Sequence, residues 1–178
     1  EWQRFDQAKL QDSEIQEIFQ AYFAIFPWQK LPADSVGFDL GCGSGRWARG
    51  VAKRVGTLHC IDPSDAIEVA KRNLSDCKNC VFHRASVCAI PRPDSSADFG
   101  YSLGVLHHVP DTQAGIRACV QKLKPGAPFL IYLYHAFEHR PLSLYFLWKV
   151  SDLVRRLLCR TPHRFKCAFS EVAALVFY

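Results

Sequence analysis

The stretch that decides the fold is Val-Gly-Phe-Asp-Leu-Gly-Cys-Gly-Ser-Gly, residues 36–45. Its apolar first half is typical of a buried strand, and a helical pattern begins directly after the last glycine, at Arg46. Three glycines within five residues allow positive φ angles and let a ligand approach the main chain closely. The N-terminus of the next helix suits an anionic group. The stretch therefore predicts a strand, a glycine turn and a helix that bind a cofactor.

Strand and helix patterns alternate on both sides of this turn. An aromatic amphipathic helix is predicted over residues 13–26, ending before Pro27. Thr112 is expected to cap a later helix that buries one face. The buried residues of that helix would be Ile116, Cys119, Val120 and Leu123. Strands are predicted at 36–40, 57–61, 81–84, 98–103 and 129–134, with the remaining helices at 46–55, 65–74 and 142–158.

Strands that alternate with helices at this spacing form right-handed βαβ units. The predicted fold class is therefore α/β, a Rossmann-like, doubly wound and mostly parallel sheet. Ligands of such sheets bind beyond the carboxyl ends of the strands, beside the first strand. The glycine turn, Asp62, Ser86 and residues 103–108 all follow strands. We expect them to share one edge of the sheet.

The two ends of the chain differ in charge. Residues 1–134 hold 15 Lys and Arg against 14 Asp and Glu, whereas residues 135–178 hold 7 against 3. We expect residues 1–134 to form the cofactor-binding core with its N-terminal helix, and residues 135–178 to form a helical, basic and aromatic cap or insertion of the same domain. Three interpretations of the second segment are open. It could be a lid over a small molecule, a surface for a membrane or partner chain, or a cover for the sheet.

The spacing of the glycine turn distinguishes two classes of cofactor. The dinucleotide fingerprint is G-x-G-x-x-G, whereas this turn reads G-x-G-x-G and is preceded by an acid, Asp39. Residues 39–45 resemble the first motif of the class I S-adenosylmethionine-dependent methyltransferases. Other segments between residues 36 and 134 are similar to that family in the expected order. They are Asp62 after the second strand, 85–91 (the family's Gly-Asp-Ala-x-x-Leu-Pro), 98–108 (its fourth strand and following loop) and 123–127 (its Leu-Lys-Pro-Gly-Gly turn).

The resemblance implies S-adenosylmethionine as the cofactor and a role for each matching residue. Asp39 would orient the turn and the methionine amino group, and Asp62 would accept hydrogen bonds from the ribose hydroxyls. Ser86 departs from the family, which has Asp there; its hydroxyl could still bond the adenine amino group, or Ser86 could be a turn residue only. The expected cofactor-binding residues are Asp39, Gly41, Cys42, Gly43, Asp62, Pro63, Ser64, Ser86, Val87 and Leu103.

The resemblance also implies methyl transfer to a small-molecule acceptor, which needs alignment and a group that takes a proton. His107 and His108 are the candidate catalytic residues because they follow the fourth strand; the alternative is a structural role. Tyr134 and His135 are a second choice for the base. Trp2, Arg4 and Tyr22 could close over the cofactor or could simply pack in the core.

Two other functions remain open. An NAD(P)-dependent oxidoreductase suits the fold but not the turn spacing or Asp39, and a non-catalytic cofactor-binding or scaffold protein is compatible with Ser86 and with a short sheet. We expect no metal site, because Cys77 and Cys80 form a lone CxxC without a second pair. We expect no nucleic-acid partner, because the core is nearly neutral.

The chain also carries signs of its compartment and completeness. Scattered cysteines and the polar residues 1–9, which lack an apolar signal region, predict a cytoplasmic protein. The family sheet has seven strands and five are predicted here, and the chain has no Met. We therefore expect either a fragment or a fold with a reduced sheet edge. A reduced edge would need cover from the chain's own tail or from a homodimer.

Overall fold

The computed structural model describes residues 12–134, 142–161, 165–166, 169–170 and 173. The chain divides into two compact units, residues 1–134 and 135–178. The expectation that the second unit is a cap or insertion of the first stays a prediction.

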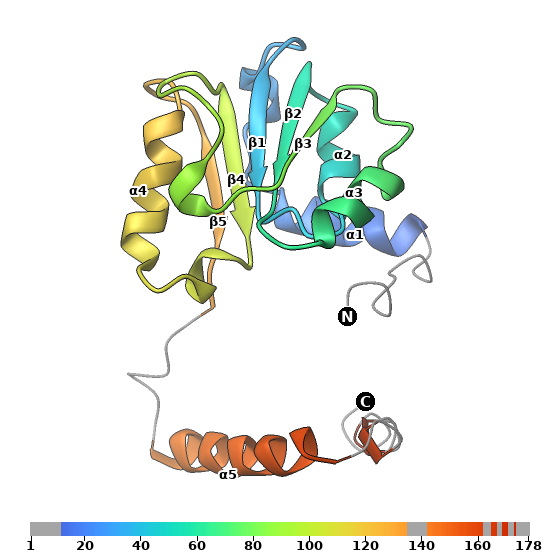
Figure 1. Cartoon of the computed structure of the whole chain (residues 1–178), viewed down its shortest axis with the longest axis vertical. Coiled ribbons are helices and arrows are strands. Elements are labelled where there is room, and N and C mark those ends of the chain that lie inside the picture. Colours follow the sequence, from blue (N-terminus) through green and yellow to red (C-terminus); the bar gives the residue numbers. More distant parts are fainter. Residues whose placement is uncertain (1–11, 135–141, 162–164, 167–168, 171–172, 174–178) are drawn as a thin grey trace. The chain divides into compact units, whose positions relative to one another are not determined.

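The first unit contains a five-stranded parallel sheet (Figure 1). The strand order is β3-β2-β1-β4-β5, so the order reverses between β1 and β4. This reversal confirms the predicted doubly wound sheet and places its switch point at the glycine turn after β1. The strands are β1 (Val36–Leu40), β2 (Thr57–Ile61), β3 (Cys80–His83), β4 (Phe99–Leu103) and β5 (Phe129–Tyr132).

Helices cover both faces of the sheet (Figure 1). Helices α1 (Asp12–Tyr22), α2 (Ala48–Ala52) and α3 (Ala66–Asn73) lie on one face, and α4 (Thr112–Lys122) lies on the other. One apolar cluster includes Phe19 and Val51, and a second includes Phe38 and Cys119. Short 3-10 helices occur at Trp28–Lys30 (η2), Val87–Ala89 (η3) and Leu106–His108 (η4). Helices thus cover both faces of the sheet. The carboxyl ends of the strands remain accessible for a ligand site.

The first two helices are shorter than the sequence predicts. Helix α1 ends at Tyr22, not at residue 26, because the chain turns so that Phe23 and Phe26 can both be buried. Their rings meet edge to face at 5.8 Å. Helix α2 is limited to residues 48–52. The residues on each side of α2 form turns, which shortens the predicted helix by several residues.

Two predictions for helix α4 were wrong. Its cap is Asp111, whose Oδ1 accepts a hydrogen bond from the Ala114 N–H at 2.8 Å, while the Thr112 hydroxyl donates to the Leu106 carbonyl at 3.0 Å. Val120 is 51% exposed, whereas Cys119 is fully buried. The helix therefore faces the sheet through Cys119. Val120, the next residue along the helix, points away from the sheet.

The second unit contains helix α5 (Leu142–Cys159), as the sequence predicts. Helix α5 and the residues that follow it line a cavity of about 470 Å³ whose walls are mostly apolar. Among the residues that the structure describes, no helix is both long enough and apolar enough to cross a membrane.

Candidate cofactor and acceptor site

The glycine turn follows β1 and has a backbone that only glycine adopts readily. The φ angles of Gly41, Gly43 and Gly45 are +77°, +53° and +83°. A side chain at this position would also clash, because a Cβ on Gly41 would lie 2.4 Å from a methyl carbon of Val105. A Cβ on Gly45 would lie 2.7 Å from Leu74. The turn is therefore fixed by conformation and by close packing against the segments that follow β4 and α3.

The N–H groups of this turn are used within the protein. Those of Gly41 and Cys42 donate to the Ile61 carbonyl at 2.7 and 3.1 Å, and that of Gly43 donates to Asp62 Oδ2 at 3.0 Å. The Cys42 side chain is buried in the core at 4% exposure. Cys42, one of the predicted cofactor residues, therefore offers neither its thiol nor its N–H to a ligand in this structure.

Asp62 ties the glycine turn to the end of β2. Its carboxylate is buried and accepts from the Gly43 N–H, from the Ser64 N–H at 2.9 Å and from the Ser64 hydroxyl at 2.6 Å. A carboxylate has about four acceptor positions, so about one stays open here. Pairing with both hydroxyls of a ribose would require Ser64 to release its hydroxyl bond. Pro63, between the two, is exposed.

Asp39 is a buried carboxyl group in β1 and is 1% exposed. Tyr101 lies opposite it on β4, and the Tyr101 hydroxyl donates to Asp39 Oδ2 at 3.0 Å. Burial raises the pKa of Asp39 to about 8, although the Tyr101 hydrogen bond opposes this shift; the nearby charge of Asp62 raises the pKa further. The apo protein therefore keeps a proton on Asp39 at neutral pH.

Ser86 and Val87 follow β3 at the start of η3. Ser86 is exposed and makes no capping hydrogen bond with its side chain. The Val87 side chain is partly buried against the second apolar cluster. Ser86 thus has a free hydroxyl, while Val87 is held by packing.

The two candidate catalytic histidines differ in their surroundings. Both ring nitrogens of His107 are buried and have no hydrogen-bond partner. The His107 ring lies between Tyr134, at a centroid distance of 4.2 Å, and His108, at 4.0 Å. Burial lowers the pKa of His107, and His108 lowers it further. His108 itself is exposed. His107 is thus a neutral ring whose two polar atoms are unpaired, which is unusual for buried groups.

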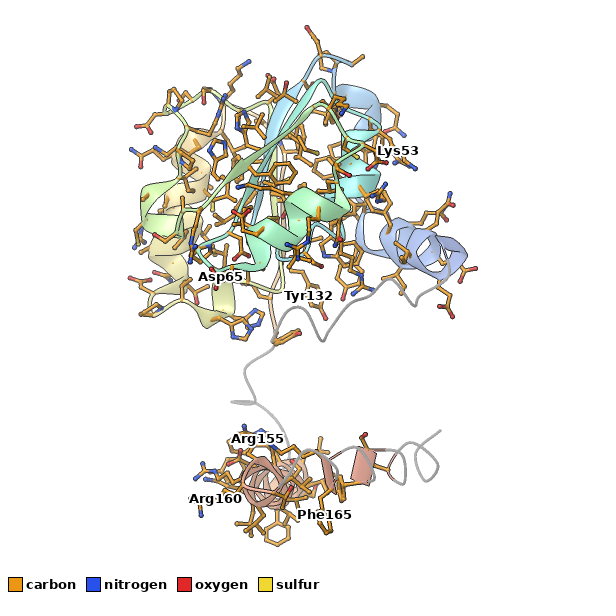
Figure 2. The ribbon with its side chains drawn as sticks, turned by 45° about the vertical axis from the view of Figure 1, so that its right-hand side comes forward. Lys53, Asp65, Tyr132, Arg155, Arg160 and Phe165 are labelled. Carbon is orange, nitrogen blue, oxygen red and sulfur yellow. The ribbon has the colours of Figure 1, made fainter. Side chains whose placement is uncertain are left out.

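His107 is one member of a continuous line of rings, which we call the aromatic row. From Tyr134 the row continues to Tyr132 at 5.9 Å, from Tyr132 to Tyr22 at 5.1 Å, and from Tyr22 to Trp47 at 4.7 Å. The Arg46 guanidinium lies over Trp47 at 4.6 Å, and its Nε is buried without a partner. Figure 2 shows Tyr132 at the same edge of the first unit as Asp65, which follows β2, and away from Lys53. The members are His108, His107, Tyr134, Tyr132, Tyr22 and Trp47, with Arg46 at the end.

A cavity of about 340 Å³ opens beside the aromatic row. Leu103, predicted to contact the methionine end of the cofactor, shares this cavity with two rings of the row. Burial raises the pKa of Tyr22, and Tyr132 raises it further, so the Tyr22 hydroxyl stays protonated. The lining residues are Ala21, Tyr22, Ile25, Leu103, Leu130, Ile131 and Tyr132. The cavity therefore suits a small, mainly apolar molecule.

The structure brings most of the predicted site residues to one sheet edge. Trp2, Arg4 and His135 lie outside the described residues. Tyr22 does reach the edge, where it packs against Trp47 and Tyr132. Sequence reasoning missed Tyr101 and Arg46, and no local motif marks either of them. Only the pairing of β1 with β4 places Tyr101 opposite Asp39.

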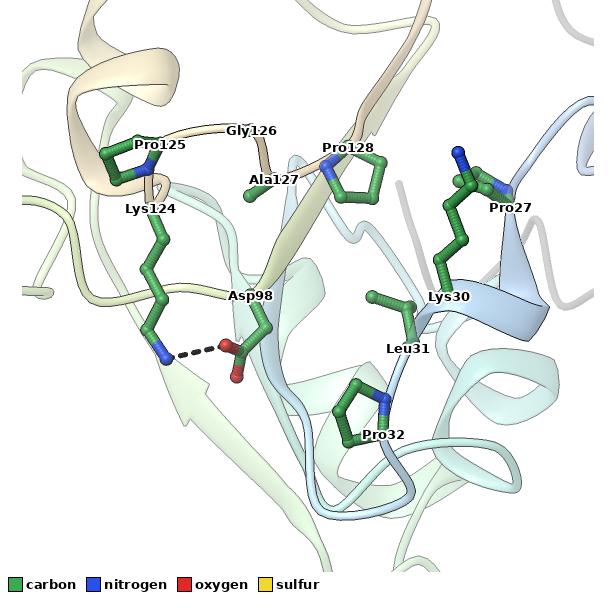
Figure 3. Close-up of a pocket in the computed structure, with 10 residues that line it drawn as sticks. All are labelled: Pro27, Lys30, Leu31, Pro32, Asp98, Lys124, Pro125, Gly126, Ala127 and Pro128. Carbon is green, nitrogen blue, oxygen red and sulfur yellow. Dashed lines mark hydrogen bonds and ion pairs between the residues drawn. The ribbon is translucent and has the colours of Figure 1, made fainter.

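A second cavity, of about 430 Å³, lies at the opposite edge of the sheet (Figure 3). Two of its three charged side chains are paired, because Lys124 Nζ lies 2.6 Å from Asp98 Oδ1 and Asp98 Oδ2 accepts from the Val36 N–H at 2.8 Å; the third is Lys30. None of the site residues predicted from the sequence lines this cavity. We therefore place the site at the edge with the glycine turn.

Within the residues that the structure describes, no group of three or more His, Cys, Asp or Glu side chains could hold a metal ion. His83, which lies near the CxxC pair in sequence, is bound to His59, with His59 Nδ1 and His83 Nε2 at 2.8 Å. The seven described cysteines are free thiols.

Comparisons with known proteins identify the family. The family model described as "Methyltransferase domain" matches residues 38–131, more than half of the chain. The ubiquinone biosynthesis O-methyltransferase of Pseudomonas fluorescens is 30% identical over 132 residues, which cover 72% of this chain and 55% of that protein. The chain thus spans about half the length of the curated relatives it matches.

Solved structures agree on the fold. The N-methyltransferase NodS from Bradyrhizobium japonicum, in complex with S-adenosyl-L-homocysteine, has a TM-score of 0.55 at 19% identity, covering 71% of this chain and 64% of NodS. The [4+2]-cyclase SpnF has a TM-score of 0.53 at 20% identity, covering 64% of this chain and 42% of SpnF. These matches confirm the predicted fold and the predicted resemblance, and they give no support to an oxidoreductase. This chain belongs to the methyltransferase domain family and has the fold of the class I S-adenosylmethionine-dependent methyltransferases.

Proposed function

We propose that this protein binds S-adenosylmethionine beside the glycine turn and transfers its methyl group to a hydroxyl of a small apolar acceptor. The observation that carries this proposal is His107, a partly exposed neutral ring whose two nitrogens are buried and unpaired at the sheet edge where the predicted cofactor residues meet. An unpaired buried polar atom is costly in a folded protein unless a ligand or water completes it. An acceptor hydroxyl is a suitable partner.

The cofactor side of the proposal rests on two buried carboxyl groups. Asp39 lies one residue before the end of β1 and Asp62 directly follows the neighbouring β2, and neither has a cationic side chain among its hydrogen-bond partners in the structure. S-adenosylmethionine carries an ammonium group, which would stabilise the Asp39 carboxylate in a low-dielectric site, and ribose hydroxyls, which would donate to Asp62. When bound, it supplies an activated methyl group. The residues that would hold it are those predicted from the sequence, with Cys42 acting only through its place in the turn.

His107 would accept the proton that the acceptor hydroxyl loses. Its lowered pKa keeps the ring neutral near pH 7, so that a ring nitrogen can take a proton. His108 is exposed and its ring lies tilted against that of His107, so we assign it a positioning role. Tyr134 covers another part of the His107 ring and would limit its rotation.

The acceptor class follows from the cavity beside the aromatic row. Its walls are apolar except for tyrosine hydroxyls, and its volume of about 340 Å³ suits a single substituted ring. The Pseudomonas fluorescens relative is named as an O-methyltransferase of ubiquinone biosynthesis. We therefore propose an apolar phenol as the acceptor and its hydroxyl oxygen as the atom that is methylated.

A second candidate function is cofactor binding without methyl transfer. Ser86 favours it, because a neutral hydroxyl stands where the family has a carboxylate. The cyclase SpnF has the same fold, so the fold alone does not decide the reaction. A cytoplasmic location and homodimer formation stay predictions. β5 is one of the two outer strands of the described sheet, with β3 the other, and would be the strand available for pairing.

The test is methyl transfer from a labelled donor to a panel of substituted phenols, with calorimetric binding of S-adenosylhomocysteine measured in parallel. We expect His107→Gln to lower kcat by about 10²–10⁴-fold and to leave thioether binding unchanged. His108→Gln is the matched control and should lower kcat by about tenfold at most. Thioether binding without transfer to any acceptor would favour the second candidate. Absence of thioether binding would overturn both.

A further inference from the structure

Helix α5 carries a line of exposed apolar side chains. Phe146, Leu153 and Leu157 are 69%, 59% and 58% exposed. Their spacing of seven and four residues places them on one face of the helix. We call these three residues the apolar stripe. Phe165, just beyond the helix, is exposed to a similar degree. Such a contiguous exposed set indicates an interaction surface.

A line of basic side chains runs beside the apolar stripe. Lys149, Arg156 and Arg160 each follow one member of the stripe by three residues, so each is its neighbour on the helix surface. We call these three residues the basic row. Among the described residues of the second unit, the one acidic side chain is Asp152, which pairs with Arg155 at 2.6 Å and Arg156 at 2.8 Å. Five basic residues against one acid leave this surface strongly positive.

Aromatic rings lie beside the basic row. Lys149 Nζ is 5.4 Å from the Tyr145 ring and 5.6 Å from the Trp148 ring. Tyr and Trp have apolar bodies and polar tips, which suits them to the boundary between water and a lipid bilayer. Figure 2 looks nearly along the helix axis and shows Arg155 and Arg160 projecting outward from it.

Another side of α5 faces an apolar cavity of its own unit. Leu147, Val150, Val154 and Leu158 line the apolar cavity of the second unit together with Phe169 and Ala173. The apolar stripe is not among the residues that line this cavity. Among the described apolar side chains of α5, the stripe is the set that is more than half exposed and lines no cavity.

We infer that α5 docks in the plane of a lipid bilayer whose surface carries anionic phospholipid headgroups. The apolar stripe would enter the boundary of the acyl region, and the basic row would pair with the headgroup phosphates. Four charged residues, Lys149, Asp152, Arg155 and Arg156, lie in the middle of the helix and make a spanning orientation costly. A second copy docked through the same face would bring two basic rows together. This inference goes beyond the proposed function and does not depend on it.

The test is co-flotation of the full chain with vesicles of phosphatidylcholine alone and of phosphatidylcholine mixed with phosphatidylglycerol. We expect binding to the anionic vesicles that weakens as salt rises. Leu153→Glu should weaken that binding at least about tenfold, because it buries a charge in place of an apolar side chain. The double variant Lys149→Gln and Arg160→Gln should weaken binding and flatten its salt dependence.

Val120→Glu is the matched control, because Val120 is an exposed apolar residue on a helix of the first unit. It should leave vesicle binding unchanged. Circular dichroism and thioether binding show that each variant is folded. No binding to anionic vesicles, or equal binding to both kinds, would overturn the inference. Self-association that Leu153→Glu abolishes, without vesicle binding, would also overturn it and assign the face to a second copy. Methyl transfer to a soluble phenol is a separate readout, so a failure here is distinguishable from a failure of the proposed function.

Discussion

The glycine turn and the aromatic row lie at the same edge of the sheet, but the polar groups of the turn have hydrogen-bond partners, whereas buried polar atoms of the row do not. The N–H groups of Gly41, Cys42 and Gly43 all have partners, and the Asp62 carboxylate accepts three hydrogen bonds. In the aromatic row, the nitrogens of His107 and the Nε of Arg46, at the other end of the row, have none. The difference suggests that the cofactor side is built in advance, while the acceptor side keeps open groups for a ligand to complete.

The largest effect is expected where the turn is packed most closely. Gly41→Ala should cost about 3–4 kcal/mol of unfolding free energy, because it combines an unfavourable φ angle with a steric clash against Val105. Gly126→Ala is the control: Gly126 has a similar φ of +80°, but its Cβ would meet no atom within 4 Å. It should cost about 1 kcal/mol. Equal costs, measured by urea unfolding, would show that the turn is not tightly held.

The buried carboxyl of Asp39 should make stability depend on pH. Its pKa of about 8 in the folded protein exceeds the ordinary value of about 4, so the folded state binds the extra proton between these limits. The contribution of Asp39 to the free energy of unfolding is therefore full below about pH 4 and is lost as pH rises through about 8. Relative to Asp39→Asn, the wild-type protein should lose about 2–3 kcal/mol between about pH 6 and pH 8. Parallel curves for the two proteins in denaturant titrations would rule out a buried, protonated Asp39.

Removal of the Asp62 side chain should break the hydrogen bond between the glycine turn and the residue that follows β2. Asp62→Ala leaves the Gly43 N–H and the Ser64 groups without their acceptor, so thioether binding should weaken at least about tenfold, which is about 1.4 kcal/mol. Asp94→Ala is the control, since Asp94 is an exposed aspartate that pairs with Lys122 away from the turn. Calorimetry should show no change for it. Unchanged affinity in Asp62→Ala would mean that the turn does not need this anchor.

The smallest effect is expected in the aromatic row. His107→Phe removes two ring nitrogens that have no partner, so unfolding free energy should change by no more than about 0.5 kcal/mol. Tyr101→Phe also removes only a polar atom from a ring, but that atom is bonded to Asp39, and the loss should cost about 1–3 kcal/mol. A large cost for His107→Phe would show that His107 has partners in solution and that the two sides of the site are built alike.

Sequence reasoning succeeded where one local pattern fixes one local structure. The strands 36–40 and 57–61 were predicted to the residue, because an apolar run that stops at a turn leaves little choice. Helix α1 was overextended because the burial of Phe23 and Phe26 overrides the helical period. The cap at Asp111 was missed because Asp and Thr are adjacent and both are good caps.

The site was predictable in part for the same reason. Asp39, the glycine turn and Asp62 belong to recognisable sequence motifs. Their proximity in space follows from the order of the strands in the sheet. The Asp39–Tyr101 hydrogen bond depends on the register between β1 and β4, which no short stretch encodes. Nor does the pair His107–His108 reveal which ring is buried and unpaired. That distinction arises from Tyr134, 27 positions after His107.

The protonated Asp39 has a consequence for how ligand binding would be measured. A cationic ligand bound beside this carboxyl group stabilises its ionised form, so near neutral pH the protein would release a proton as the ligand enters. The buffer would absorb that proton with its own heat of ionisation. The apparent enthalpy of binding would then differ between Tris and phosphate at the same pH, and the difference would count the protons that leave the sheet edge.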